Sequence, residues 1–183
     1  MEIYIVRHGQ TDWNIQDKLQ GHTNIPLNKV GIEQAHITKQ TLSNITFSKI
    51  YCSPLERCMQ TAEIINKNNL PIIIDDTLIE RSFGDLEGCT GHNIEDFLIF
   101  EKNLNASNVE PIQSFFARIH SFLTDIINNS TDEKVLIVTH GGVGIAVDCY
   151  FNPQLTNSNL RLLFMKNCSY KKYIINKGDI HEK

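Results

Sequence analysis

Long apolar runs are missing from this 183-residue chain, and so is any strong excess of one charge. No stretch approaches the ~18–20 consecutive apolar residues that a membrane-spanning helix requires, so we expect a soluble protein with no membrane partner. The formal net charge of −4 argues against a general nucleic-acid-binding protein. It still allows a small positive pocket, because net charge and local field are separate quantities.

Cysteine pairs with redox or metal-binding spacing are also missing. The cysteines are odd in number and include no C-x-x-C: Cys52, Cys58, Cys89, Cys149 and Cys168. The amino terminus begins a strand-like run at once, without the basic stretch and apolar region of a signal peptide. We therefore expect reduced thiols in a cytoplasmic protein.

The chain does contain short β-branched runs that alternate with helical patterns. The runs at 2–6, 49–52, 71–74 and 134–138 predict buried strands. Helices are predicted from Asn28 to about Ser43, from Ser53-Pro54 through Ile65, over 111–128, and in the apolar stretch after 138. This alternation predicts a three-layer α/β/α sandwich with a mostly parallel sheet.

The tail and one internal segment depart from the alternation. Residues 161–166 and 169–175 predict two further strands, joined at Asn167-Cys168, as an antiparallel edge of the sheet. The least patterned segment, 84–110, is rich in glycine, asparagine and acids and is the best candidate for a variable cap. No linker or repeat interrupts the sequence, so we expect a single domain over 1–183.

Charged side chains and histidines follow the predicted strands at the edge where an open α/β sheet binds ligands. Arg7 and His8 follow the first strand, Arg57 the second, Glu80 the third and His140 the fourth. Arginine forks match phosphate oxygens, neutral imidazole attacks phosphorus, and a glutamate can donate and accept the required protons. A second histidine can neutralise transition-state charge, and Gly9, Gly141 and Gly142 would let backbone N–H groups approach an anion. These residue types together indicate phosphoryl transfer.

Several sequence blocks, in a fixed order along the chain, carry a resemblance to a known family. The run Arg7-His8-Gly9-Gln10-Thr11 with Asp12-Trp13-Asn14 resembles the signature of the histidine phosphatase superfamily, the phosphoglycerate mutase-like family. Further blocks support it: Gln20-Gly21; Leu27 with Gly31 and Gln34-Ala35; Ser53-Pro54-Leu55-x-Arg57 with Thr61-Ala62; Glu80 through Gly88; and Val138 through Gly142. Gln10 and Lys18 depart from the pattern, since many members carry glutamate and arginine there.

The resemblance implies a role for each matching residue. His8 would be the phosphorylated nucleophile, while Arg7, Arg57 and His140 would hold the phosphoryl oxygens. Glu80 would be the proton donor and acceptor, and the phosphate pocket would be lined by Asn14, Gln20, Gly21 and Gly141. No metal and no cofactor are implied.

Several alternatives stay open at this stage. Asp75, Asp76, Glu87 and Glu95 are nearby carboxylates that compete with Glu80 for the acid role, and the role of His92 in the presumed cap is undecided. Cys52 and Cys58 are expected to be small buried residues beside the site, not nucleophiles.

The leading hypothesis is a phosphatase that acts on a small phosphorylated metabolite. A mutase of the same fold is the main alternative, but segment 82–101 lacks lysine and arginine, and Phe83 stands where a mutase typically has tyrosine. A metal hydrolase lacks the expected histidine spacings, and a silent binding module would have lost core residues that are all present. Relatives act on α-ribazole phosphate, sugar phosphates or phosphoserine, so the substrate stays open, as does a homodimer.

Overall fold

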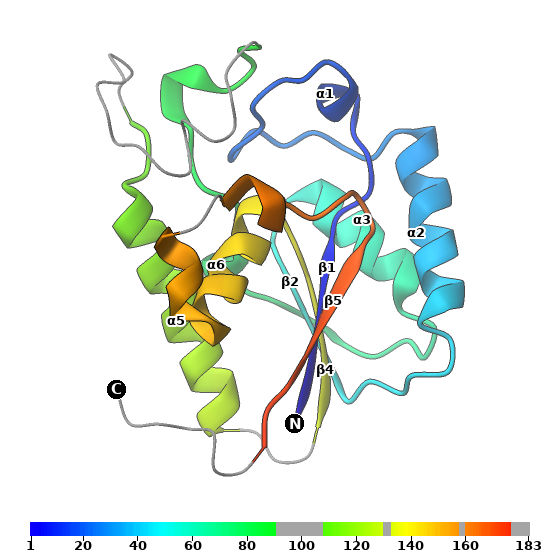
Figure 1. Ribbon diagram of the computed structural model, residues 1–183. Coiled ribbons are helices and arrows are strands. Elements are labelled where there is room, and N and C mark those ends of the chain that lie inside the picture. The colour runs from blue at the N-terminus through cyan, green and yellow to red at the C-terminus, as the bar shows by residue number, and fades with distance from the viewer. Residues whose placement is uncertain (91–107, 130–132, 158–159, 177–183) are drawn as a thin grey trace.

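The computed structural model describes residues 1–90, 108–129, 133–157 and 160–176, and within them five strands form one sheet (Figure 1). The order is β3-β2-β4-β1-β5, with β1 (Glu2–Arg7), β2 (Lys49–Cys52), β3 (Ile72–Ile74), β4 (Lys134–Thr139) and β5 (Tyr170–Ile174). The first four strands pair in parallel, and β5 lies antiparallel to β1 at one edge. The predicted mostly parallel sheet with an antiparallel edge is confirmed.

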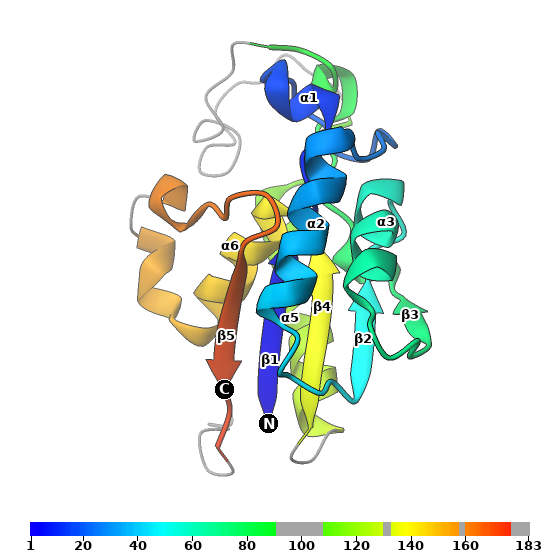
Figure 2. The same cartoon turned by 90° about the vertical axis from the view of Figure 1, so that its right-hand side faces the viewer.

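Helices cover both faces of this sheet. One face carries α2 (Lys29–Thr41) and α3 (Glu56–Ile65), and the other carries α5 (Ile112–Asn128) and α6 (Gly141–Phe151), as Figure 2 shows. Side chains alternate along β1, so Ile3 and Ile5 pack on the α5 side while Tyr4 and Val6 pack on the α3 side. A strand buried on both faces has a continuous apolar sequence, which explains the run at 2–6. The three-layer prediction is confirmed.

The two helix starts on the α2/α3 face compare differently with the sequence prediction. Asn28 caps α2 as expected, since its side chain accepts a hydrogen bond of 2.9 Å from the Gly31 N–H. The helix predicted to open at Ser53-Pro54 begins only at Glu56, after an extended Leu55. The N-cap position is Leu55, and the hydroxyl of Ser53 lies 2.7 Å from a ring nitrogen of His140.

The predicted strand at 161–166 is wrong. Leu160–Leu163 is a short 3₁₀ helix, η4, and the residues after it run without regular structure toward β5. Side chains bind the carbonyl groups here, since Lys171 donates to Leu163 and Arg7 donates to Met165. Those contacts replace the ladder bonds that a strand would need. The second tail strand, predicted over 169–175, is confirmed as β5.

The remaining described elements are short. They are α1 (Asp12–Ile15) and the 3₁₀ helices η1 (Asp76–Leu78), η2 (Gly84–Leu86) and η3 (Pro153–Asn157). Most of the predicted cap lies outside the described residues, and so do Glu95 and His92. Within the described ranges, no helix has the length and apolar character needed to cross a membrane.

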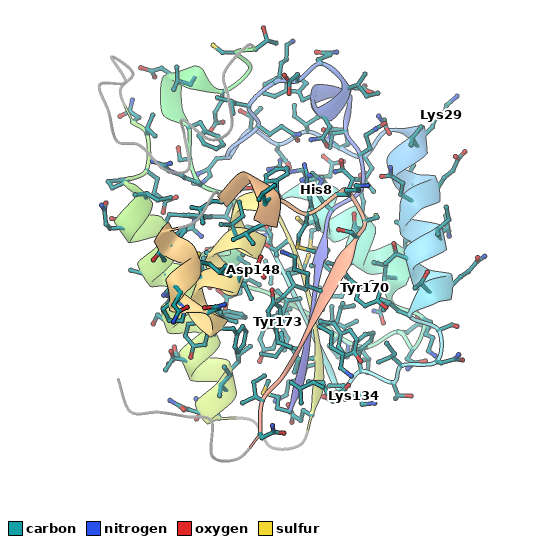
Figure 3. The ribbon with its side chains drawn as sticks, in the orientation of Figure 1. His8, Lys29, Lys134, Asp148, Tyr170 and Tyr173 are labelled. Atoms are coloured by element: carbon teal, nitrogen blue, oxygen red, sulfur yellow. The ribbon has the colours of Figure 1, made fainter. Side chains whose placement is uncertain are left out.

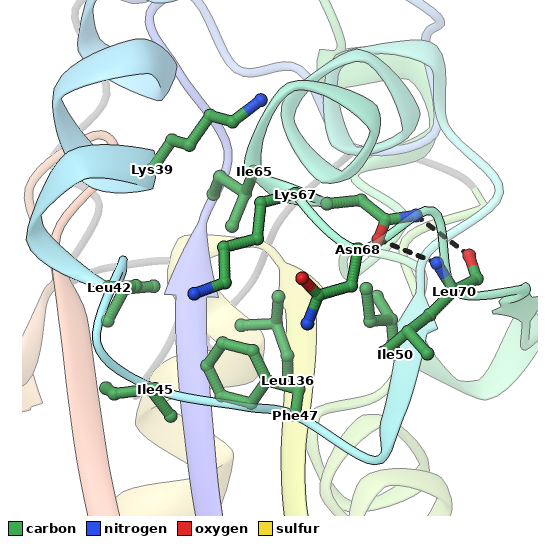
Figure 4. Close-up of a pocket in the computed structure, with 11 residues that line it drawn as sticks. Lys39, Leu42, Ile45, Phe47, Ile50, Ile65, Lys67, Asn68, Leu70 and Leu136 are labelled. Atoms are coloured by element: carbon green, nitrogen blue, oxygen red, sulfur yellow. Dashed lines mark hydrogen bonds between the residues drawn. The ribbon is translucent and has the colours of Figure 1, made fainter.

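A shallow crevice lies where α2 and α3 end, on the face of the sheet that they cover (Figure 4). Its walls are apolar and include Leu42, Phe47 and Ile65, and Lys67 reaches over it to the carbonyl of Ser43. The side-chain amide of Asn66 binds both main-chain groups of Leu70, which closes the loop below α3. None of its lining residues carries the chemistry indicated by the sequence.

Candidate functional site

The strand ends bring the predicted residues to one edge of the sheet. Arg7 is the last residue of β1, and His8 continues the ladder by donating its N–H to the carbonyl of Thr139 at 2.9 Å. Arg57 lies in the first turn of α3, and His140 caps α6 directly after β4. Figure 3 places His8 beyond the end of β1, where these segments meet.

His8 is buried and held in one tautomer. Its Nδ1 atom lies 2.7 Å from the carbonyl oxygen of Gly9. A carbonyl oxygen only accepts, so Nδ1 carries the proton and Nε2 keeps its lone pair. Burial, reinforced by the charges of Arg57 and Arg7, holds the pKa of His8 well below its ordinary value. The ring is therefore neutral at physiological pH.

Two buried guanidinium groups lie beside His8. Arg57 donates to the carbonyl oxygens of Gly21 at 2.8 Å and Thr23 at 2.9 Å, and Arg7 donates to Met165 at 2.6 Å. The Nε atoms of both arginines are buried without a hydrogen-bond partner. Burial lowers the pKa of Arg7 to about 10, which leaves the group charged at neutral pH. Two fixed cations with unpaired donors are suited to bind an anion.

His140 lies next to His8, with ring centroids 5.3 Å apart in an edge-to-face arrangement. Its Nε2 atom faces the hydroxyl of Ser53, and the cavity that His8 lines does not include it. Burial holds the pKa of His140 well below its ordinary value, and Arg57 adds to the shift. Cys58 packs 3.4 Å from the same ring nitrogen, and burial raises the pKa of its thiol to about 12.

Glu80 lines the same cavity as His8 and the two arginines, and its carboxylate accepts two backbone hydrogen bonds. Oε2 accepts from Gly142 N–H and Oε1 from Arg81 N–H, both at 3.0 Å. Its competitors are engaged elsewhere or exposed. Asp75 binds the N–H of Thr77, Asp76 is exposed, and Glu95 lies outside the described residues.

Glu87, another competitor, holds the loop beneath the site. Its carboxylate accepts from the N–H groups of His22, Thr23 and Phe83 at 2.8–3.1 Å. That loop includes Gly21, whose φ of +50° favours glycine and whose carbonyl accepts a hydrogen bond from Arg57. Among the described carboxylates, Glu80 is thus the one that lines the cavity.

The cavity has a volume of about 530 Å³, its open mouth included. It is lined by residues from several parts of the chain: Arg7, His8, Asn14, Lys18, Leu19, Gln20, Gly21, Arg57, Glu80, Phe83, Gly142 and Phe164. Asn14 is fixed by hydrogen bonds from Thr11 and Asn167, and Gln20 has a buried, unpaired Oε1 atom. In the described part of the chain, no three histidine, cysteine or acidic side chains are grouped to hold a metal ion.

The glycines serve packing more than anion binding. A Cβ on Gly9 would lie 2.5 Å from the carbonyl oxygen of Gly31, and its N–H already donates to the hydroxyl of Thr61. Gly141 does not line the cavity, and a Cβ at this position would lie 2.5 Å from the ring of Phe164. Gly142 lines the cavity, but its N–H binds Glu80. The expectation that these N–H groups face the anion is not met by Gly9 or Gly142 in this structure.

Leu19 and Phe164, which line the cavity, and Ser53, which contacts His140, were not assigned to the site from the sequence. Phe164 stacks on Arg7, with the guanidinium carbon 4.5 Å from the ring centroid. Ser53 orients His140. Ser53 directly follows β2, so its position at a strand end was a usable signal. Phe164 does not follow a strand, so the sequence gave no signal for its position.

The fold and this site together define a protein of the α/β class with buried arginines and histidines at the carboxyl ends of its parallel strands. The sequence profile of the "Histidine phosphatase superfamily (branch 1)" matches residues 3–182, so the chain belongs to the histidine phosphatase superfamily and is an enzyme of this family. A Bacillus subtilis protein named "Uncharacterized phosphatase PhoE" is 39% identical over 140 residues, which cover 76% of this chain and 71% of the relative.

Other relatives carry both phosphatase and mutase names. "Probable phosphoglycerate mutase GpmB" of Yersinia pestis is 30% identical over 94% of this chain and 84% of its own. The crystal structure of the alpha-ribazole phosphatase from Shigella flexneri superposes with a TM-score of 0.85 at 26% identity, covering 97% of this chain and 92% of that chain. Phosphoserine phosphatase from Entamoeba histolytica gives a TM-score of 0.81 at 26% identity, covering 94% and 90%.

Proposed function

We propose that this enzyme hydrolyses a small phosphomonoester through a phosphorylated His8. The observation that carries the proposal is the neutral, Nδ1-protonated ring of His8 beside two guanidinium groups with unpaired Nε donors. The two arginines would hold the phosphoryl oxygens, and their positive charge would also keep the imidazole unprotonated. The same two side chains would therefore bind the substrate and activate the nucleophile. Relatives named as phosphatases support hydrolysis as the outcome.

The reaction would proceed in two displacements. In the first, the Nε2 lone pair of His8 attacks phosphorus, the bond to the leaving oxygen breaks, and Glu80 supplies that oxygen with a proton. In the second, Glu80 takes a proton from water, whose oxygen attacks phosphorus. The P–N bond then breaks, and its electron pair returns to Nε2.

His140 would act on the charge of the transferred group. A dianionic phosphate next to its ring would favour the imidazolium, which opposes the effect of burial on the pKa of this histidine. The Ser53 hydroxyl, 2.7 Å from Nε2, would accept a hydrogen bond from that imidazolium and fix the ring. The charge of the transferred group would then be neutralised by side chains instead of a metal ion.

A mutase is the second candidate, favoured by relatives named phosphoglycerate mutase. It would return the phosphoryl group from His8 to a bound acid instead of to water. Among the described residues that line the cavity, Lys18 is the only cation besides the two arginines beside His8. Hydrolysis needs no second anion site, so this lining favours the phosphatase.

The test is turnover of p-nitrophenyl phosphate by wild type and His8→Ala, each with and without EDTA. We expect wild-type turnover to survive chelation and the variant to lose on the order of 10⁴-fold in kcat. Metal-dependent wild-type activity, or more than a few per cent of turnover in His8→Ala, would contradict the proposal. Incubation with 3-phosphoglycerate and its bisphosphate separates hydrolysis from mutase turnover.

A further inference from the structure

Arg118 on α5 uses every donor of its guanidinium group. Nη1 donates to the carbonyl oxygens of Thr77 at 2.5 Å and Ile79 at 2.8 Å. Nη2 donates to the Glu80 carbonyl at 3.1 Å and to Glu110 Oε2 at 3.0 Å, and Nε donates to Glu110 Oε1 at 2.8 Å. An arginine has five N–H donors, and all five are engaged. Arg118 therefore has no donor left for a substrate.

Three of these acceptors are carbonyls of the turn that delivers Glu80. This segment follows β3 and consists of η1 and the residues after it, beyond the end of the sheet. Its carbonyls at 77, 79 and 80 point to one guanidinium, which is itself stacked 4.8 Å from the ring centroid of Phe115. The helix α5 thus fixes the main chain of the residue that lines the cavity.

Glu110 binds the residues that follow Glu80 in the same segment. Its backbone N–H donates to the carbonyl of Ser82 at 3.0 Å, and its own carbonyl accepts from Arg81 Nε at 2.7 Å. Its carboxylate binds Arg118 in a two-point contact, with both side chains about one-fifth exposed. The pair therefore joins residues 77–82 to α5 by polar contacts on both sides of Glu80.

We infer that Arg118 is a positioning residue for Glu80. It holds the main chain so that the Glu80 side chain reaches the leaving oxygen of the substrate phosphate that His8 attacks, and it does not touch the substrate itself. This inference rests on the proposed function, because it assigns Arg118 to the proton-donation step. Proton transfer depends on short, aligned contacts, so a loosened Glu80 loses effect without any change in its own chemistry.

The test compares single-turnover phosphorylation of the enzyme by ethyl phosphate and by p-nitrophenyl phosphate. Arg118→Met removes the fork and keeps the apolar stem over Phe115, and Arg118→Lys keeps the charge with a single-point donor. Glu80→Gln is the reference for loss of the acid, and the double variant Glu80→Gln/Arg118→Met measures coupling. Ile127→Ala, a buried α5 residue away from this turn, controls for destabilisation of the helix.

We expect Glu80→Gln to slow phosphorylation by ethyl phosphate about 10²-fold or more and by p-nitrophenyl phosphate much less, because an acidic phenol leaves without help. Arg118→Met should show the same selectivity at about 10-fold, Arg118→Lys less, and the double variant should be no slower than Glu80→Gln. Ile127→Ala should lower the melting temperature without this selectivity.

Equal losses on both substrates, or additive losses in the double variant, would overturn the positioning role. If Arg118→Met does not fold, equal losses on both substrates in Arg118→Lys would overturn the positioning role. If Glu80→Gln itself shows no selectivity between the substrates, the acid assignment in the proposed function fails, and the inference fails with it. Selectivity in Glu80→Gln without selectivity in the Arg118 variants rejects the inference alone.

Discussion

The Nδ1 atom of His8 lies 2.7 Å from the carbonyl oxygen of Gly9, the next residue along the chain. This one contact decides which ring nitrogen is protonated and which is available to phosphorus. It is a local contact, made within a turn whose close approach to Gly31 allows only glycine at position 9. The nucleophile is therefore oriented by its own backbone before any substrate binds.

Burial of neutral His8 makes stability depend on pH. The unfolded chain takes up a proton near the ordinary imidazole pKa of about 6.5, whereas the pKa of folded His8 is well below that value. The unfolded state therefore binds more protons below pH 6.5, so the free energy of unfolding falls as pH falls from there toward the folded pKa. His8→Gln removes this contribution.

Urea unfolding at pH 7 and pH 5.5 measures the effect. From pH 7 to pH 5.5, the free energy of unfolding of the wild type should fall by about 1 kcal/mol more than that of His8→Gln. His36→Gln, at an exposed position on α2, is the matched control and should behave like wild type. An identical pH dependence in His8→Gln and wild type would show that His8 is not held neutral by the fold.

The sequence predicts the site residues whose positions follow from where strands end. It does not predict those whose positions depend on contacts between distant segments. Arg7 and Arg57 were predicted because parallel strand ends meet at one edge. The contact between His140 and Ser53 and the position of Phe164 against Arg7 were not predicted. Both depend on packing between segments that are distant in the sequence. The acceptors of Arg118 are main-chain carbonyls, which every residue possesses, so no sequence pattern marks them.

We expect Glu87 to have a structural role and not to act as the acid. Its carboxylate accepts hydrogen bonds from three backbone N–H groups, and a glutamine would oppose one of them with its own N–H donors. We expect Glu87→Gln to destabilise the protein by roughly 1–3 kcal/mol and to raise KM, because the loop at Gly21 and Thr23 also holds Arg57. The loss in rate should be the same for ethyl and p-nitrophenyl phosphate.

Thermal unfolding and the two-substrate comparison check this prediction together. Glu63→Gln, at an exposed site on α3, supplies the same chemical change without the contacts. A selective loss on ethyl phosphate in Glu87→Gln would instead identify Glu87 as the acid.

The cavity should prefer a neutral or apolar leaving group. Beyond the arginines its lining offers the aromatic rings of Phe83 and Phe164 and the side chain of Leu19, with Lys18 as the one further cation among the described lining residues. Arg118, another basic residue near this region, has no free donor. A carboxylate on the leaving group would thus lack an arginine fork.

Values of kcat/KM for benzyl phosphate and 3-phosphoglycerate at matched ionic strength test the preference. We expect benzyl phosphate to be the better substrate, and Phe164→Ala to reduce that advantage. Lys18→Met should leave benzyl phosphate turnover nearly unchanged. A clear preference for 3-phosphoglycerate that disappears in Lys18→Met would reverse the assignment and make Lys18 a carboxylate-binding residue.

The chemical nature of the phosphorylated intermediate tests the central claim most directly. Wild-type enzyme is mixed with ³²P-labelled substrate, quenched within one turnover, and divided between acid and alkaline incubation, with His8→Ala treated in parallel. The account predicts label on wild type that is lost in acid and kept in alkali, as expected of a phosphoramidate, and no label on His8→Ala. Acid-stable label, alkali-labile label, or label that persists in His8→Ala would contradict it.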